Sequence, residues 1–327
     1  MTSSNKSASP VMVIIAFAIV YIVWGSTYFF IEKAVAEFPP FMLGALRFLM
    51  AGICLTAWCV IKGEKLFGIP NIRHAIISGL LLLFFGNGII IWVEQSVPSG
   101  LVSITVSSAP LWFVLLDQPK WADNFRSRSI ILGMIIGLAG VLMLFSEQVA
   151  ASMKGTGSIA IGTMALLILA SIAWVGGSLY SKYKSSKGST VVNTSWQMMS
   201  AGIAFLPGML IRGEASGFDW SGVSTGAWLS LFYLVFLGSI AGFSAYVWLL
   251  KVRPAMQVST YAYVNPVVAV LLAVIFANEK ITLIQILGLV TILGSVLLIN
   301  MAKYRREKIA ESLKLKAESP VRERALS

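Results

Sequence analysis

Long runs of apolar residues, separated by short polar connections, dominate the chain. A helix that crosses a bilayer needs about 20 mostly apolar residues. Ten runs reach or approach that length: 11–31, 41–61, 75–93, 101–116, 129–146, 159–180, 196–211, 227–250, 256–277 and 282–301. The runs do not alternate apolar and polar positions, so they predict helices rather than barrel strands. The pattern therefore predicts an all-α integral membrane protein of ten transmembrane helices.

The two halves of the chain resemble each other at a nearly constant spacing. Residues fall on similar residues at an offset of 150 (Trp24 on Trp174, Ala51-Gly52-Ile53 on Ala201-Gly202-Ile203), of 156 (Gly86 on Gly242, Pro110 on Pro266) and of 155 (Gly133 on Gly288). Each half holds five predicted helices, an odd number, so the second half must enter the membrane upside down. We therefore expect one five-helix repeat over 1–150, an inverted repeat over 151–302, and a tail over 303–327. Inverted repeats around a central cavity are typical of secondary transporters.

Positive charges are distributed unevenly between the two sets of connections. With the N-terminus placed in the cytoplasm, the inner segments hold 20 of the 25 Lys and Arg residues and the outer connections hold four. Arg47 is the remaining one and lies inside a span. Short cytoplasmic loops carry an excess of Lys and Arg. We therefore expect both termini to be cytoplasmic and the basic tail to be solvated or to lie at the lipid headgroups.

Composition excludes several other classes of protein. Hydrophobic residues make up 57% of the chain and charged residues 12%, about half the charged content of soluble domains. Cys54 and Cys59 share one apolar run and His74 is the single histidine, so no metal cluster or catalytic triad can be assembled. No phosphate-binding loop occurs. We expect no enzyme activity, no cofactor and no metal, and we attribute the net charge of +11 to membrane orientation rather than to nucleic acid.

Several short motifs together resemble a known family. They are Trp24-Gly25-Ser26-Thr27-Tyr28, Arg47-Phe48, Pro110, Pro266 and Asn278-Glu279. Over about residues 11–301 the chain is similar to the EamA-type ten-helix permeases of the drug/metabolite transporter superfamily. The resemblance implies a bacterial inner-membrane carrier, commonly an exporter of amino acids or related metabolites, the aromatic-amino-acid exporter being one kind. It also implies a cavity surrounded by helices one, three, four, six, eight and nine, with helices five and ten at the edge.

The chain departs from the family pattern at two places. Asn278-Glu279 stands where the family often has Gly-Glu. The equivalent place in the first half reads Asp123-Asn124 and follows an unusual Asp117-Gln118-Pro119. The inner end of the fourth helix is therefore expected to differ from the family.

Arg47 is the charge that lies well inside a predicted span. Placing an arginine there costs about 2.5–3.5 kcal/mol unless it is paired or hydrated, so we expect it to have a partner. Two interpretations stay open: a group that binds a carboxylate or gates the cavity, or a structural donor to neighbouring helices. Glu32 and Glu94 lie at predicted outer ends, where we expect solvated interface residues rather than proton sites.

Two prolines at equivalent positions mark candidate hinges. Pro110 and Pro266 lie in the middle of predicted helices, where a proline removes one backbone hydrogen bond and kinks the axis. Static kinks are the alternative, and Gly25 permits either bending or close packing. Polar and aromatic residues around the prolines are predicted to line the substrate cavity: Trp24, Ser26, Thr27, Tyr28, Asn87, Trp92, Ser107, Ser108, Trp112, Trp174, Ser178, Tyr246, Tyr261, Tyr263 and Asn265.

These observations predict a secondary transporter that works by alternating access and exports amino acids or similar small amphipathic metabolites. The alternative is a channel or facilitator for small solutes. The expected partners are a small-molecule substrate and the lipid bilayer, without nucleic acid, and a monomer is the expected form.

Overall fold

The computed structural model describes residues 9–67, 69–97, 105–144, 161–185, 189–277 and 282–301, together with Val102, Ser146 and Ala150. Within these residues the regular elements are helices, and they contain no strand. Seven of these helices are long and apolar enough to cross a membrane, or up to eight if the bent pair Gln118–Phe125 and Arg128–Leu144 forms one span. The all-helical membrane prediction is confirmed to this extent.

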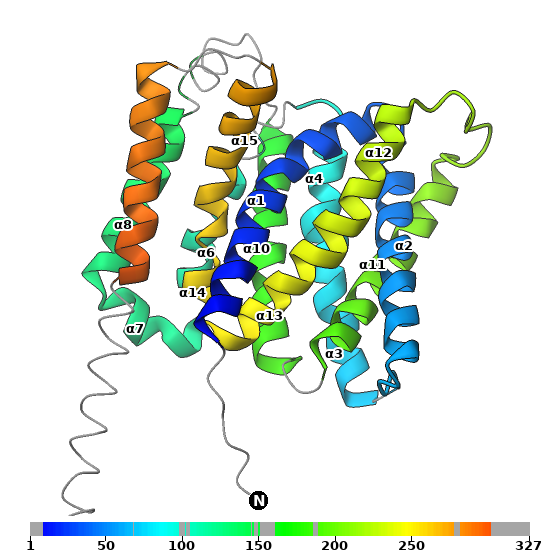
Figure 1. The fold of residues 1–327 in the computed structure, drawn as a ribbon, viewed down its shortest axis with the longest axis horizontal. Coiled ribbons are helices and arrows are strands. Elements are labelled where there is room, and N and C mark those ends of the chain that lie inside the picture. The colour runs from blue at the N-terminus through cyan, green and yellow to red at the C-terminus, as the bar shows by residue number, and fades with distance from the viewer. Residues whose placement is uncertain are drawn as a thin grey trace, which may run out of the picture.

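The helices stand side by side as one bundle (Figure 1). The first half comprises α1 (Pro10–Val35), α2 (Pro40–Ile61), α3 (Ile69–Gly79), η1 (Leu80–Asn87), α4 (Gly88–Val93), α6 (Ala109–Leu116), η2 (Gln118–Lys120), α7 (Trp121–Phe125) and α8 (Arg128–Leu144). The second half comprises α10 (Ile161–Lys184), α11 (Thr190–Ile211), α12 (Thr225–Tyr233), η3 (Leu234–Phe243), α13 (Ser244–Val252), α14 (Ala255–Val258), α15 (Tyr261–Ala277) and a helix over Leu283–Met301.

Both halves contain a π-helix at the same place. η1 ends at Asn87 and η3 at Phe243, which are separated by the offset of 156 seen in the sequence. Each π-helix continues directly into an α-helix, so α3, η1 and α4 form one span and α12, η3 and α13 form another. π-Helical turns inside α-helices occur frequently at functional sites. The two segments are therefore the first places to search for a site.

Equivalent residues of the two halves make reciprocal contacts between α2 and α11. A Cβ added at Gly52 would meet the Sδ of Met199 at 2.8 Å, and one added at Gly202 would meet the backbone nitrogen of Leu49 at 2.7 Å. Leu49 and Met199 are themselves separated by 150 residues. Small residues of this kind let membrane helices approach closely. The α2–α11 contact is therefore reciprocal, with each glycine packed against the residue that repeats the other glycine's neighbour.

The ends of α2 and α11 show the same reciprocity. Glu64, just after α2, accepts a hydrogen bond from the hydroxyl of Ser189 before α11, at 3.2 Å. Glu214, just after α11, accepts one from the backbone nitrogen of Met42 in the first turn of α2, at 2.8 Å. Each helix thus ends where the other begins, and the two run antiparallel. Carboxylates are favourable at helix N-termini.

Two further contacts show the same reciprocity. Gly133 of α8 packs against Ile299, and Gly288 packs against the backbone of Leu144, with both pairs related by an offset of 155. α8 and the Leu283–Met301 helix lie together at one edge of the bundle (Figure 1). In the interior, Gly86 packs against Trp174 and Gly242 against Trp24.

The close α2–α11 contact gives a prediction about stability. Gly202→Ala should lower the thermal unfolding midpoint in detergent, because the new Cβ meets the Leu49 backbone, which cannot rotate away. Overpacking of this kind costs about 1–3 kcal/mol. Gly176→Ala is the matched control, since a Cβ at Gly176 of α10 has no heavy atom within 4 Å. An unchanged midpoint for Gly202→Ala would show that α2 and α11 can separate without loss.

An acidic residue also ties the connection between α1 and α2 to the start of α12. Glu37 accepts hydrogen bonds from the hydroxyl and the backbone nitrogen of Ser224, both at 2.6 Å. Both bonds, the hydroxyl one foremost, hold the pKa of Glu37 below its usual value. Ser224 is the N-cap of α12 and its hydroxyl also accepts from Ala227.

A dependence of stability on pH follows. A carboxyl whose pKa is lower in the folded protein adds stability above the pKa of the unfolded chain and loses it as the pH falls through the folded value. Glu37→Gln should therefore lower the thermal unfolding midpoint near neutral pH, with a difference from wild type that shrinks below about pH 4. Glu32→Gln, which removes an exposed carboxyl of α1, is the control. A constant difference from about pH 7 to pH 3 would contradict the expected linkage.

Candidate functional site

A cavity lies between the two halves, at the level of both π-helices. Its volume is about 60 Å³, counted as space for the centres of water molecules. At about 10–15 Å³ for each water this is room for about five. Its wall is formed by Trp24, Thr27, Tyr28, Ile31, Arg47, Phe48, Leu83, Asn87, Ile90, Val106, Ala109, Ala170, Ser171, Trp174, Gly238, Ser239, Phe243, Tyr261 and Asn265. Most of this wall is apolar, so the few polar groups on it decide what can bind.

Arg47 brings a positive charge to the cavity. Its side chain is 4% exposed. Its Nε donates to the hydroxyl of Ser239 in η3 at 3.0 Å, and its Nη1 donates to Oδ1 of Asn87 in η1 at 3.2 Å. Both partners are neutral, and no ion pair within the described ranges involves Arg47. The guanidinium therefore bridges the two halves without direct contact with a carboxylate of the described residues.

Another polar group of the wall has unused hydrogen-bonding capacity. Oδ1 of Asn265 is buried and has no hydrogen-bond partner in the described part of the chain. The two indole nitrogens are engaged: that of Trp24 donates to the carbonyl of Gly238 at 3.1 Å, and that of Trp174 lies beside the hydroxyls of Tyr246 and Tyr261. The cavity thus offers one cation and one spare acceptor.

Four aromatic rings gather at the Trp24 end of the cavity wall. Trp24, Trp174, Tyr246 and Tyr261 come from α1, α10, α13 and α15, and their contacting rings have centroids between 4.8 and 5.6 Å apart. The hydroxyl of Tyr246 lies 2.6 Å from that of Ser178, which fixes the ring against α10. Aromatic pairs of this kind stabilise a fold by more than the burial of their apolar area alone provides. Trp24, Trp174 and Tyr261 line this end of the cavity, and Tyr246 packs against all three from behind the wall.

Seven of the predicted cavity residues lie on this wall: Trp24, Thr27, Tyr28, Asn87, Trp174, Tyr261 and Asn265. The other eight do not line it: Ser26, Trp92, Ser107, Ser108, Trp112, Ser178, Tyr246 and Tyr263. Ser26 pairs with Tyr233, and Tyr263 donates to the carbonyl of Met134. Trp92 faces the guanidinium of Arg212, at 4.5 Å from its ring centre.

Some wall residues were not predicted. Phe48 comes from α2, as does the predicted Arg47, although the resemblance places the second helix outside the ring of cavity helices. Phe243 and Ser239 are the repeat partners of Asn87 and Leu83, and all four lie on the wall. Projecting the predicted residues onto their repeat partners would have found Phe243.

The two candidate hinge prolines lie in different local structures. Pro110 was expected in mid-helix, but it lies in the first turn of α6, where a missing N–H breaks no helical hydrogen bond. Pro266 lies inside α15, as expected. Its missing N–H leaves the carbonyl of Ala262, four residues earlier, without its helical donor, and the hydroxyl of Ser107 donates to that carbonyl at 2.9 Å. The bond joins the two halves.

Gly25 lies where α1 and α15 approach closely. A Cβ there would fall 2.5 Å from Cβ of Val268 and 3.0 Å from the carbonyl oxygen of Asn265. The geometry is that of a packing position. Asn278-Glu279 lies outside the described residues.

Glu94 was expected at a solvated interface, and this prediction is wrong. The residue is 4% exposed, and it follows α4 directly. The first turn after α4 therefore turns its side chain inward rather than into water.

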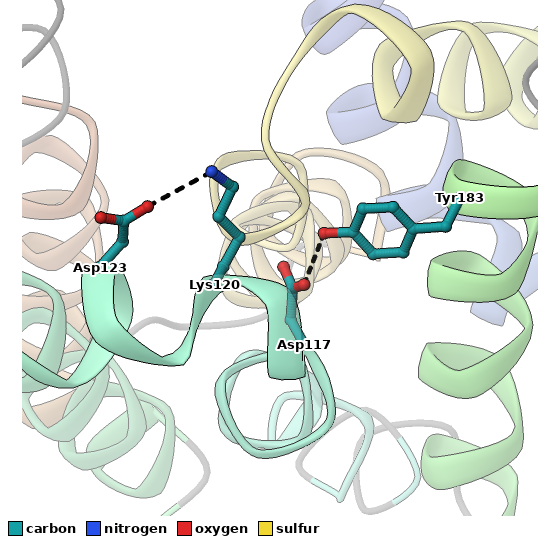
Figure 2. A network of polar contacts seen from close by, with 4 residues as sticks. All are labelled: Asp117, Lys120, Asp123 and Tyr183. Atoms are coloured by element: carbon teal, nitrogen blue, oxygen red, sulfur yellow. Dashed lines mark hydrogen bonds and ion pairs between the residues drawn. The ribbon is translucent and has the colours of Figure 1, made fainter.

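The departure at Asp117-Gln118-Pro119 leads from α6 through the single turn η2 into α7, and Figure 2 shows the polar contacts of Asp117 and Lys120 there. Asp117 is 3% exposed and accepts a hydrogen bond from the hydroxyl of Tyr183, in the last turns of α10, at 2.6 Å. Lys120 and Asp123 form an exposed ion pair at 3.3 Å beside it. The end of α6 is thus tied to the end of α10, at the end of the bundle where α1 begins (Figure 1).

Comparisons with known proteins agree with this architecture. The model of the EamA-like transporter family matches twice, over residues 11–146 and 161–301. The uncharacterized inner membrane transporter YedA of Escherichia coli (strain K12) is 37% identical, over 87% of this chain and 89% of that protein. A probable amino-acid metabolite efflux pump of the same strain is 25% identical, over 89% of this chain and 95% of the pump. One crystal structure with 17% identity, covering 91% of this chain and 100% of its own, superposes with a TM-score of 0.72, which shows the fold.

Proposed function

This chain belongs to the EamA-like transporter family, and we propose that it is a secondary transporter that exports amino acids or similar small amphipathic metabolites across the inner membrane by alternating access. The proposal rests most on Arg47, a buried guanidinium that reaches the cavity without a carboxylate partner among the described residues. Such a group is a specific site for a carboxylate, because guanidinium and carboxylate match in charge and planar geometry.

The remaining wall completes a site for an amino acid. The spare acceptor of Asn265 suits an ammonium group. Rings of Trp24, Trp174 and Tyr261 suit an apolar or aromatic side chain. The related amino-acid metabolite efflux pump supports the same substrate class.

The size of the cavity supports a carrier rather than a channel. Room for about five waters is less than an amino acid with a sizeable side chain needs. The wall must therefore open for loading and release, and the four packed rings are the group that has to move on the Trp24 side. Movement of this kind is the basis of alternating access.

Two inverted five-helix repeats with ten spans are part of the proposal. The reciprocal glycine contacts, the antiparallel repeat partners α2 and α11, and the doubled family match all support it. Topology reporters test it. Fusions after Lys187 and Met301 should report the cytoplasm, and fusions after Lys154 and Glu214 the outside. A reversed signal at any of these positions would rule out the five-plus-five inversion.

The substrate class is tested by binding to the purified protein. Amino acids should raise the unfolding temperature, because a ligand stabilises the state that binds it, whereas sugars, nucleosides and aromatic cations without a carboxylate should not. Counterflow in liposomes then separates the mechanisms. In liposomes loaded with unlabelled amino acid, a carrier transiently accumulates labelled amino acid above its outside concentration, whereas a channel or facilitator with a continuous pore only lets the label equilibrate. Stabilisation by nucleosides or sugars only would overturn the proposed substrate class.

A further inference from the structure

Glu94 continues the cavity-facing side of the third span. Its backbone nitrogen donates to the carbonyl of Ile90 at 2.9 Å, so the helical turn runs on past α4. Asn87, Ile90 and Glu94 follow one another at intervals of three and four residues, which places them on one face of a helix. Asn87 and Ile90 lie on the cavity wall. Glu94 is therefore one turn beyond the wall, at the end opposite to the aromatic rings.

The carboxyl group of Glu94 is buried without a hydrogen bond. Both of its oxygens lack a partner within the part of the chain that the structure describes. Its neighbours along the helix, Ile90, Val93 and Val97, belong to a buried apolar cluster that also contains Leu167 of α10. An ionised carboxylate in such surroundings loses its hydration and gains no donor in exchange.

Few charges act on this carboxyl. The ionisable groups within electrostatic reach are Glu32 and Tyr28 of α1 and Arg47 of α2. The α10 residues of the apolar cluster, Leu167 and Ala170, do not ionise. Glu32 is exposed and repels a second negative charge, and Arg47 already donates to Asn87 and Ser239. No neighbouring side chain of the described residues therefore neutralises Glu94 by contact.

We propose that Glu94 is a proton-exchange site, at which a proton and the ammonium group of the substrate exclude each other. The inference rests on the proposed function. A buried carboxyl without a donor is completed either by its own proton or by a cation, and it cannot hold both. When the cavity opens, the O–H bond of Glu94 breaks, its proton passes to water, and the electron pair stays on the carboxylate. The ammonium group then pairs with Glu94 while the substrate carboxylate pairs with Arg47.

Exchange in opposite directions follows from this exclusion. A proton that arrives from one side displaces the ammonium group from Glu94, and substrate that arrives from the other side displaces the proton. An inward proton gradient would then drive export of the amino acid. The site lies between two halves whose contacts are reciprocal, so both sides can reach it in turn.

Proton release on binding tests the proposal. L-phenylalanine is added to purified protein in weak buffer, and the pH of the solution is recorded. Wild type should release up to about one proton for each phenylalanine bound. Glu94→Gln should release none, and Glu64→Gln, which removes an exposed carboxyl just after α2, should behave as wild type. N-acetyl-L-phenylalanine, which has no ammonium group, should release no proton from any variant.

Infrared spectroscopy tests the proton itself, independently of transport. The carbonyl band of a protonated carboxylic acid should be present in wild type, absent in Glu94→Gln and shifted in Glu94→Asp. Absence of the band from wild type overturns the proposal, as does equal proton release from wild type and Glu94→Gln, or proton uptake by wild type. If phenylalanine and other amino acids do not bind at all, the proposed function is at fault, and the infrared band still decides whether Glu94 holds a proton.

Discussion

Arg47→Lys should lose most of its transport and keep its fold. The guanidinium of Arg47 donates from Nε to Ser239 and from Nη1 to Asn87, one on each π-helix, and still has donors to offer a substrate. A lysine ammonium is a single point of charge and cannot hold both contacts and a planar carboxylate. Hydrogen bonds to a charged group contribute about 1.5–3 kcal/mol, so we expect substrate affinity to fall roughly 10- to 100-fold.

The measurement compares three quantities in the same variant. Amino-acid affinity in detergent and initial counterflow rate in liposomes should both fall, while the unfolding midpoint stays close to that of wild type. Arg126→Lys is the matched control, since Arg126 is exposed near the end of α7. Wild-type transport by Arg47→Lys would reduce Arg47 to a generic positive charge. A parallel loss of transport and stability would favour the structural interpretation.

The lengths of the apolar runs predicted where the first two helices lie, because a helix in contact with lipid needs apolar residues across the whole hydrocarbon layer. The runs over 11–31 and 41–61 correspond to α1 and α2 within a few residues. α11 begins six residues earlier than the predicted 196, at Thr190. Its first turns are polar but buried: Thr194 bonds to the carbonyl of Thr190, and Gln197 donates to Ser78 and Ser181. Hydropathy cannot anticipate that polar residues will be buried where they hydrogen-bond within their own helix or to neighbouring helices.

The break in the predicted run 101–116 has a local cause that the apolar pattern does not reveal. The hydroxyl and the backbone nitrogen of Ser108 both bond to the carbonyl of Thr105. A serine that bonds to the backbone in this way competes with the helical ladder. The chain therefore turns at Ser107–Ser108, and α6 starts afresh with Pro110 in its first turn.

Arg47 could be singled out from the sequence as a site residue, whereas Glu94 could not. Arg47 was found because a charge in an apolar run is costly wherever it points. Its exposure to the cavity depends on how α2 packs against η1 and η3, which no local pattern encodes. Glu94 at the end of a run looks like an interface residue, and its burial depends on residues from α1 and α10 that are distant in sequence.

Pro266→Ala should slow the exchange between the two access states and leave substrate affinity nearly unchanged. The alanine supplies a backbone N–H that can donate to the carbonyl of Ala262. In the wild-type protein that carbonyl accepts its hydrogen bond from Ser107 instead. Bending α15 at this point would then break a helical hydrogen bond that wild type does not have. A net value of about 1 kcal/mol for that bond corresponds to about a five-fold slower exchange. Affinity should persist because Pro266 does not line the cavity.

The same reasoning makes Pro110 and Pro207 informative controls. Pro110→Ala should change the rate little, because Pro110 occupies the first turn of α6, where no helical hydrogen bond is missing. Pro207 lies inside α11 like Pro266 inside α15, but α11 contributes no residue to the cavity wall, whereas α15 contributes Tyr261 and Asn265. Counterflow rates and affinities of the three alanine variants decide the matter. A slow exchange confined to Pro266→Ala identifies α15 as the bending element. Equal slowing in Pro207→Ala, or a joint loss of affinity and stability in Pro266→Ala, would mean that the proline only shapes a static helix.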